Sequence, residues 1–171
     1  NLWQLSRYVP AQKLQIEFLN VSRNTEKYEG DVLAPSSCGL VYAFAVTVFA
    51  NPLAWMEVTG LDKAAAEALS RAIHAVKPLH KDILSGHILP IGEEPSGIGW
   101  TGMQSIRNER EGYVLIIREW NEAAEAAFTL WDTDRCRLKL TRVMAMHERD
   151  AVVTKDALSP AELELEPNDR G

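Results

Sequence analysis

The sequence predicts an α/β first part followed by an all-β second part. Up to residue 85, apolar runs of strand length alternate with helix-forming segments in the order strand, helix, strand, helix. After Gly86, short β-branched and aromatic runs are separated by turn residues, a spacing typical of an antiparallel β-sandwich. A chain of 171 residues has room for one ordinary domain or two small ones, so we place a domain boundary between residues 1–85 and 86–171.

The first predicted strand, residues 13–19, runs directly into a polar loop that extends to Asp31. In α/β folds, the loops that follow the carboxyl ends of strands carry the ligand site. The polar loop is therefore the candidate functional site. The alternative, a solvated turn without a function, is equally consistent with the residues, because surface loops are commonly polar.

Two helices are predicted in the first part. Ser36 or Ser37 is a plausible N-cap for a helix through about Val48 that is apolar nearly all round and therefore buried on several sides. Before it, an N-terminal helix or loop ends at or before Pro10. After it, residues 53–58 form the second predicted strand.

Asp62 is predicted to cap an alanine-rich helix whose apolar residues repeat at helical spacing. Those residues are Ala65, Leu69, Ala72, Ile73 and Val76. Pro78 should kink or restart this helix, so that residues 78–85 form a separate turn.

Seven strands are predicted after Gly86, and the run from Gly92 to Gly99 connects the first two. This glycine-containing run lacks the lysine and the following helix of a phosphate-binding loop. The predicted strands are residues 87–91, 100–107, 113–120, 126–131, 138–146, 151–154 and 163–165.

Composition and charge exclude several classes of function. The net charge of -6 and the lack of clustered Lys and Arg argue against a nucleic-acid partner. No run approaches the length of a membrane span, and no signal segment opens the chain. Because the chain begins at Asn1 and already reads like the inside of a folded element, we expect it to be the tail of a longer protein.

No metal site or cofactor is predicted. The four histidines, His74, His80, His87 and His147, lack the spacing of a helical ligand pair and are interpreted as surface or capping residues. Cys38 and Cys136 form no metal motif and can pair only if the fold brings them together. The sequence leaves the oligomeric state and the compartment open.

Carboxylates and tryptophans are the remaining candidates for chemistry on sugars. Glu17 lies within the first strand, where it points into a site or forms a structural ion pair, and Glu26, Asp31 and Glu57 are expected to be solvated. Trp55, near the end of the second strand, is placed to stack on a sugar ring. The three remaining candidates, Trp100, Trp120 and Trp131, are expected to fill the sandwich core.

Four segments, residues 18–28, 33–37, 49–55 and 100–106, together resemble the C-terminal part of melibiase-like glycoside hydrolases, relatives of α-galactosidase family 36. These enzymes have a (β/α)8 barrel followed by an antiparallel β domain. The resemblance implies that residues 1–85 are the last strand–helix units of the barrel and that residues 86–171 are the β domain.

The resemblance also implies a retaining mechanism, with an aspartate nucleophile upstream of Asn1 and an aspartate acid/base on a later strand. A Ser-Asp-Asn-Thr-Asp pattern that carries the acid in many relatives can be aligned with residues 22–26, which places Arg23 where the acid should be. An arginine cannot donate a proton at working pH, so no catalytic residue is assigned. The expected sugar-binding residues are Asn20, Arg23, Asn24, Lys27, Tyr28 and Trp55.

The leading hypothesis is thus a C-terminal fragment of a glycoside hydrolase that acts on α-galactosides or related sugars. The isolated fragment should be inactive, because half a barrel cannot close its sheet or assemble both carboxylates. The alternative is a non-catalytic carbohydrate-binding or interaction module built on the β-sandwich, with Trp100 or Trp120 exposed.

Overall fold

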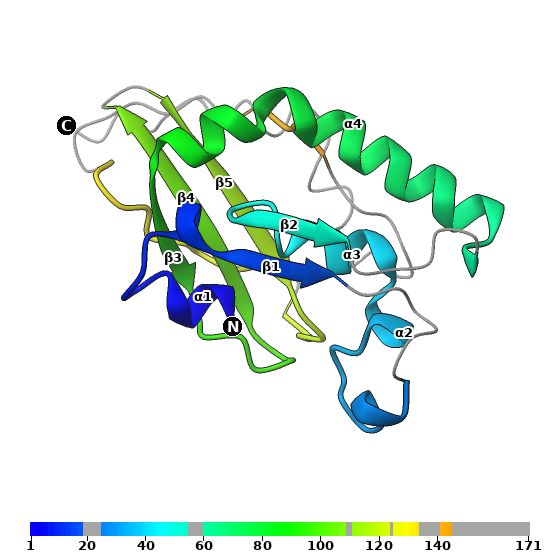
Figure 1. The fold of residues 1–171 in the computed structure, drawn as a ribbon. Coiled ribbons are helices and arrows are strands. Elements are labelled where there is room, and N and C mark those ends of the chain that lie inside the picture. Colours follow the sequence, from blue (N-terminus) through cyan, green and yellow to red (C-terminus); the bar gives the residue numbers. More distant parts are fainter. Residues whose placement is uncertain (19–24, 55–59, 109–110, 124, 134–140, 145–171) are drawn as a thin grey trace.

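The computed structural model describes residues 1–18, 25–54, 60–108, 111–123, 125–133 and 141–144. These residues form a small mixed α/β structure with a two-stranded parallel sheet and a three-stranded antiparallel sheet (Figure 1). The elements in chain order are α1 (Leu2–Leu5), η1 (Ala11–Lys13), β1 (Gln15–Phe18), η2 (Thr25–Tyr28), α2 (Pro35–Cys38), α3 (Leu40–Ala45), β2 (Asn51–Ala54), α4 (Lys63–Ser85), β3 (His87–Gly92), β4 (Trp100–Asn108) and β5 (Glu111–Arg118).

Each predicted strand of the first part overlaps a described strand, and these two strands pair with each other. β2 starts at Asn51, before the predicted start at residue 53, and residues 55–58 of that prediction lie outside the described residues. β1 and β2 run parallel, from Gln15 opposite Asn51 to Phe18 opposite Ala54. Asn51 fixes the start of β2, because its side-chain Nδ2 donates to the carbonyl oxygen of Gln12 at 2.9 Å. A parallel pair requires a crossover connection, and α2 and α3 supply it.

The predicted single helix from Ser36 or Ser37 to Val48 is wrong in its start and its continuity. Pro35 occupies the first turn of α2, Ala34 is the N-cap, and no side chain caps this helix. Gly39 then adopts a φ of 80°, which interrupts the helical backbone between α2 and α3. Most of α3 is buried, as its apolar composition predicts.

The helix capped by Asp62 is confirmed. The Asp62 side chain accepts a hydrogen bond of 2.8 Å from the backbone N–H of Ala65, and Leu69, Ala72 and Val76 are buried. The predicted break at Pro78 is wrong, because α4 continues through it to Ser85. Val76 and Ile83 are buried on either side of the proline, and this packing offsets the lost backbone hydrogen bond.

The first three strands predicted after Gly86 are confirmed in number and order. β3 pairs antiparallel with β4, and β4 pairs antiparallel with β5. The run from Gly92 to Gly99 connects β3 to β4, as predicted.

The predicted strand at residues 126–131 is wrong. Its described residues have no regular secondary structure, and side-chain hydrogen bonds, rather than a strand ladder, hold this segment near the sheet. The predicted strand at 138–146 lies largely outside the described residues, and those at 151–154 and 163–165 lie entirely outside them.

A single hydrophobic cluster joins residues from both sides of Gly86, including Phe18, Phe44, Val76 and Met103. Helix α4 packs against α3 and against the antiparallel sheet, which it crosses in Figure 1. At the junction, a buried hydrogen bond of 2.6 Å runs from Ser105 Oγ to the carbonyl oxygen of Ile83. The barrel, the sandwich and the division at residue 85 remain predictions.

Candidate functional site

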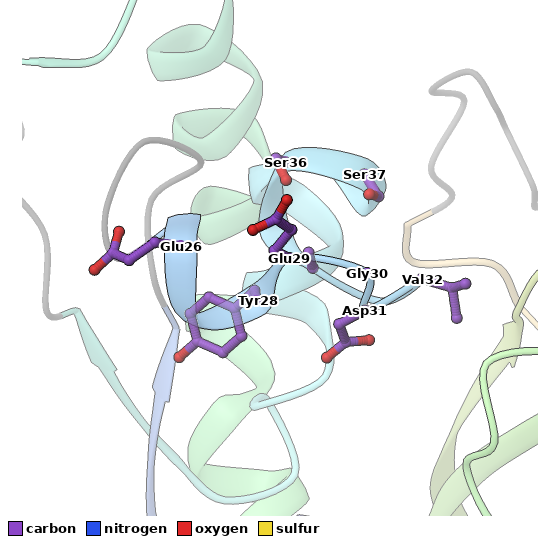
Figure 2. Close-up of a pocket in the computed structure, with 9 residues that line it drawn as sticks. Glu26, Tyr28, Glu29, Gly30, Asp31, Val32, Ser36 and Ser37 are labelled. Atoms are coloured by element: carbon purple, nitrogen blue, oxygen red, sulfur yellow. The ribbon is translucent and has the colours of Figure 1, made fainter.

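A surface hollow of about 560 Å³ lies in the polar loop that follows β1. One wall comes from η2, the other from α2, and the intervening segment crosses between them (Figure 2). Figure 1 shows that the arrows of β1 and β2 point toward the side of the molecule that carries α2 and α3. The hollow is lined by Glu26, Tyr28, Glu29, Gly30, Asp31, Val32, Ala34, Ser36 and Ser37.

The lining combines hydrogen-bond acceptors with groups that both donate and accept. Glu26, Glu29 and Asp31 contribute carboxylates, which accept only when ionised, whereas one tyrosine and two serine hydroxyls can do both. Among the described residues, the lining contains no lysine or arginine. The described part of the hollow therefore offers hydrogen-bond partners for a ligand rich in hydroxyl groups.

Local hydrogen bonds fix the floor of the hollow. Asp31 Oδ1 accepts from the backbone N–H of Leu33 at 2.8 Å, and the carbonyl oxygen of Asp31 accepts from the N–H of Ala34 at 3.1 Å. Gly30 has a φ of 83°, a conformation that side chains disfavour. The aspartate thus forms an Asx-type turn that leads into α2.

Val32 of the hollow lies next to Trp120 and to the loop that carries Ile98, and we call these three exposed apolar residues the apolar patch. Their exposed fractions are 49%, 64% and 44%. The indole Nε1 of Trp120 donates to the carbonyl oxygen of Val32 at 2.7 Å. The side chain of Asn121 donates to the carbonyl oxygen of Ile98 at 2.5 Å. Val32 belongs to both the hollow and the apolar patch.

Glu119 anchors the loop beneath the apolar patch. This residue is only 4% exposed. Its Oε2 accepts hydrogen bonds from the backbone N–H groups of Ser96, Gly97 and Gly99 at 3.1, 2.7 and 2.9 Å. Three donors that converge on one carboxylate oxygen hold residues 96–99 in a fixed position at the end of β5.

The requirement for glycine at residue 97 follows from this geometry. Its φ is 93°, and a Cβ at this position would overlap the Val32 side chain. The anchored loop therefore packs directly against the segment that forms the hollow.

Cys38 and Tyr42 lie near the same carboxylates, and neither is activated. Burial raises the pKa of the Cys38 thiol to about 11; a hydrogen bond with Trp120 lowers it, and the charges of Asp31 and Glu119 raise it further. Burial likewise raises the pKa of Tyr42. Because the thiolate is the nucleophilic form, Cys38 is not suited to nucleophilic catalysis at neutral pH.

The residues predicted to bind sugar are only partly within the described chain. Tyr28 lines the hollow, whereas Lys27 is exposed on η2 and does not belong to its lining. Four predicted residues, Asn20, Arg23, Asn24 and Trp55, lie outside the described residues.

Of the four carboxylates considered in the sequence, two line the hollow. Glu26 and Asp31 are exposed, as predicted, and both line the hollow. Glu17 is exposed on β1, and Glu57 lies outside the described residues.

The prediction that the tryptophans of the second part fill a core is wrong for Trp120 and Trp131, which are 44% and 53% exposed. Both follow the last described strand, where no opposing layer covers them among the described residues. Trp100 is half-buried and packs edge to face on Phe128 at 6.4 Å between ring centroids. The guanidinium of Arg118 lies 5.7 Å from the Trp100 ring centroid.

Two of the described histidines, His74 and His80, lie within hydrogen-bond distance of backbone carbonyl oxygens. The Nε2 atom of His80 lies 2.8 Å from the carbonyl oxygen of Ala50, and the Nδ1 atom of His74 lies 2.7 Å from that of Ser70. Within the described ranges, no three His, Cys, Asp or Glu side chains gather where they could hold a metal ion. His147 lies outside those ranges.

Reasoning from the sequence missed Glu29, Ile98 and Glu119, and it interpreted Ser36 and Ser37 as capping residues. One pattern in the sequence could have pointed to Glu119: it is a carboxylate at the end of an apolar strand, and Gly97 and Gly99 lie in a loop far from it along the chain. Only the register of β4 with β5 brings these residues together.

The candidate site as a whole is a hollow lined by carboxylates and hydroxyls, next to the apolar patch, in the loop that the sequence singled out. None of the described helices is long and apolar enough to cross a membrane. Comparison of the chain with protein-family models, with curated proteins and with solved structures finds no match.

Proposed function

We propose that the chain is the C-terminal part of a carbohydrate-active (β/α)8 enzyme that hydrolyses α-galactosides or related sugars, and that the hollow after β1 contributes to its substrate site. The observation that carries this proposal is the parallel pairing of β1 with β2, with the hollow on the side of their carboxyl ends. Ligands of parallel α/β sheets bind outside the carboxyl ends of the strands.

The size of the parallel sheet supports a larger parent fold. Within the described part of the chain, β1 and β2 pair only with each other, over four residues each. Two short strands bury little surface on their own, and parallel strands belong to larger sheets that are covered on both faces. Helix α4 follows β2 in the chain, which is the order of a barrel unit.

The chemistry of the hollow supports a sugar as the ligand. A sugar presents hydroxyl groups that can donate to the carboxylates of Glu26, Glu29 and Asp31. Its ring and hydroxyl oxygens can accept from the hydroxyls of Tyr28 and Ser36. The polar lining therefore offers complementary partners for both kinds of sugar group.

The decisive experiment is to extend the reading frame upstream of Asn1. The proposal predicts several further strand–helix units, with an aspartate at the carboxyl end of one strand as the nucleophile. The extended chain should hydrolyse an aryl α-galactoside, and the 171-residue chain alone should not. A start codon immediately before Asn1, or turnover by the 171-residue chain alone, would overturn the proposal.

A second candidate function, non-catalytic glycan binding, is favoured by the exposure of Trp120. It requires that glycan binding persist in the extended chain without hydrolysis. Replacement of the upstream aspartate by asparagine separates the two functions. Loss of turnover with retained binding supports the enzyme, whereas an extended chain that binds and never hydrolyses supports the binding module.

A further inference from the structure

We propose that two copies of the chain exchange residues 128–133, which we call the strap, so that the strap of each copy binds the antiparallel sheet of the other. The surface that receives the strap is the face of the sheet that carries Gln104. Successive residues of a strand point to opposite faces, and Ser105 points to α4, where its Oγ donates to the carbonyl oxygen of Ile83. The receiving face is therefore the one that α4 does not cover, and the proposal does not depend on the sugar site.

Gln104 recognises the backbone of the strap. Its amide donates to the carbonyl oxygen of Trp131 at 2.9 Å and accepts from the N–H of the same residue at 2.7 Å. Paired residues in an antiparallel sheet exchange bonds through the same two backbone groups, so the amide is matched to an extended backbone. These bonds are the same whether the backbone belongs to the same copy or to a second one.

Aromatic contacts at two further points make the surface specific for the strap. The Phe128 ring packs edge to face on Trp100, with 6.4 Å between the ring centroids. Gly92 leaves room for this ring, because its φ is 71° and a Cβ there would lie 2.5 Å from Phe128 Cε1. The indole Nε1 of Trp131 donates to the carbonyl oxygen of Pro90 at 3.0 Å. The surface therefore fits an extended segment with two aromatic side chains three residues apart.

The linker that joins β5 to the strap favours a helix. Residues 122–127 read Glu-Ala-Ala-Glu-Ala-Ala, and alanine and glutamate are strong helix formers. Asn121 already makes the contact of an N-cap, because its Oδ1 accepts from the N–H of Ala123 at 2.8 Å. The described residues of this linker nevertheless have no regular secondary structure. This conflict between local preference and the bound strap favours release of the strap.

Release of the strap exposes little new surface. Three of its residues, Thr129, Trp131 and Asp132, are already exposed, and the other three are partly buried. A segment with few buried contacts opens at a lower free-energy cost than the sheet beneath it. Because a second copy offers an identical surface, exchange restores every contact that release removes, which is the basis of dimerisation by domain swapping.

The test compares two variants of the 171-residue chain by sedimentation velocity. The receptor variant, Gln104→Leu, lacks the amide and keeps its strap. The strap variant, Phe128→Ala with Trp131→Ala, keeps the amide and lacks the aromatic side chains. The parent chain should form a dimer, and each variant alone should dimerise roughly tenfold more weakly. An equimolar mixture should recover most of that loss, because the intact strap of one variant meets the intact surface of the other.

A chain that carries all three substitutions is the matched control. Mixed with the receptor variant, it should not associate, because neither chain has an intact surface. Circular dichroism and thermal melting check that each variant is folded. If Gln104→Leu does not fold, a fluorescein-labelled peptide of residues 128–133 replaces it, and its binding to the strap variant is measured by fluorescence anisotropy. The same peptide with Phe128→Ala and Trp131→Ala should bind roughly tenfold more weakly.

Dimerisation that is lost in each variant and recovered only in their mixture supports exchange. A parent chain that stays monomeric overturns the proposal, as does a mixture of folded variants that associates no better than either variant alone. Association of the control mixture would also overturn it, because the dimer contact would then lie elsewhere. None of these outcomes affects the proposed function, which rests on the parallel strands and the hollow.

Discussion

The side-chain amide of Gln104 makes two hydrogen bonds to the backbone of Trp131. Gln104 Nε2 donates to the carbonyl oxygen of Trp131 at 2.9 Å, and its Oε1 accepts from the N–H of Trp131 at 2.7 Å. Gln104 is buried in the middle of β4. Because β3 and β5 already pair with both edges of β4, the side chain of Gln104, and not the backbone of β4, holds the segment around Trp131 on the sheet.

Replacement of Gln104 by leucine should lower the free energy of unfolding by roughly 1–3 kcal/mol, because both hydrogen bonds are lost while the volume is kept. Urea denaturation followed by circular dichroism measures the change. Trp131→Ala is the control, since it keeps the backbone groups that Gln104 binds. If Gln104→Leu is as stable as the parent chain, the amide does not hold this segment.

A larger loss of stability is predicted for substitution of Glu119, because its buried carboxylate accepts three backbone hydrogen bonds. Glu119→Ala leaves these N–H groups without their partner and should cost roughly 3–5 kcal/mol. Glu119→Gln keeps a carbonyl acceptor and loses the charge, so its cost should be smaller, about 1–2 kcal/mol.

The same urea denaturation compares these variants with Glu122→Ala. Glu122 is an exposed carboxylate three residues away, and its loss should change stability by less than about 0.5 kcal/mol. Equal effects of Glu119→Ala and Glu122→Ala would show that the three hydrogen bonds do not stabilise the fold.

Local features were predictable where a few adjacent residues decide the structure. The polar loop after β1 was singled out because polar residues follow an apolar run, and the Asp62 cap because it precedes an amphipathic repeat. The register of β4 with β5 places Glu119 beside Gly97, and no pattern along the chain encodes that contact. The exposure of Trp120 is likewise not predictable from the sequence, because the hydrophobicity of tryptophan favours burial.

Pro78 illustrates how tertiary packing overrides a local rule. It lies inside α4, where it cannot donate a backbone hydrogen bond, and it is exposed. Pro78→Ala should therefore raise the free energy of unfolding by roughly 1–3 kcal/mol, because alanine restores the donor and favours the helix.

Thermal melting and urea denaturation measure this gain. Lys77→Ala, a substitution at the neighbouring exposed position, should leave stability within about 0.5 kcal/mol. If Pro78→Ala destabilises the chain, α4 depends on a distortion at this residue.

The alkylation rate of Cys38 reports whether its thiol is buried. Its pKa is raised from 9.0 to about 11, chiefly by burial, so the folded state retains the thiol proton where the unfolded state has lost it. This raised pKa contributes to stability below about pH 9, and the contribution is lost as the pH rises from 9 to about 11. Thiolate is the form that reacts with iodoacetamide, so at pH 8 the folded chain should react roughly 100-fold more slowly than a thiol of pKa 9.0.

The measurement uses a Cys136→Ser background, so that Cys38 is the only thiol in the chain. The alkylation rate should rise with an inflection near pH 11, and in urea the inflection should fall near pH 9. Trp120→Phe provides an independent check, because the hydrogen bond from Trp120 lowers the pKa of Cys38 and its removal should move the inflection to still higher pH. An inflection near pH 9 in the folded chain would mean that the Cys38 thiol is solvated rather than buried.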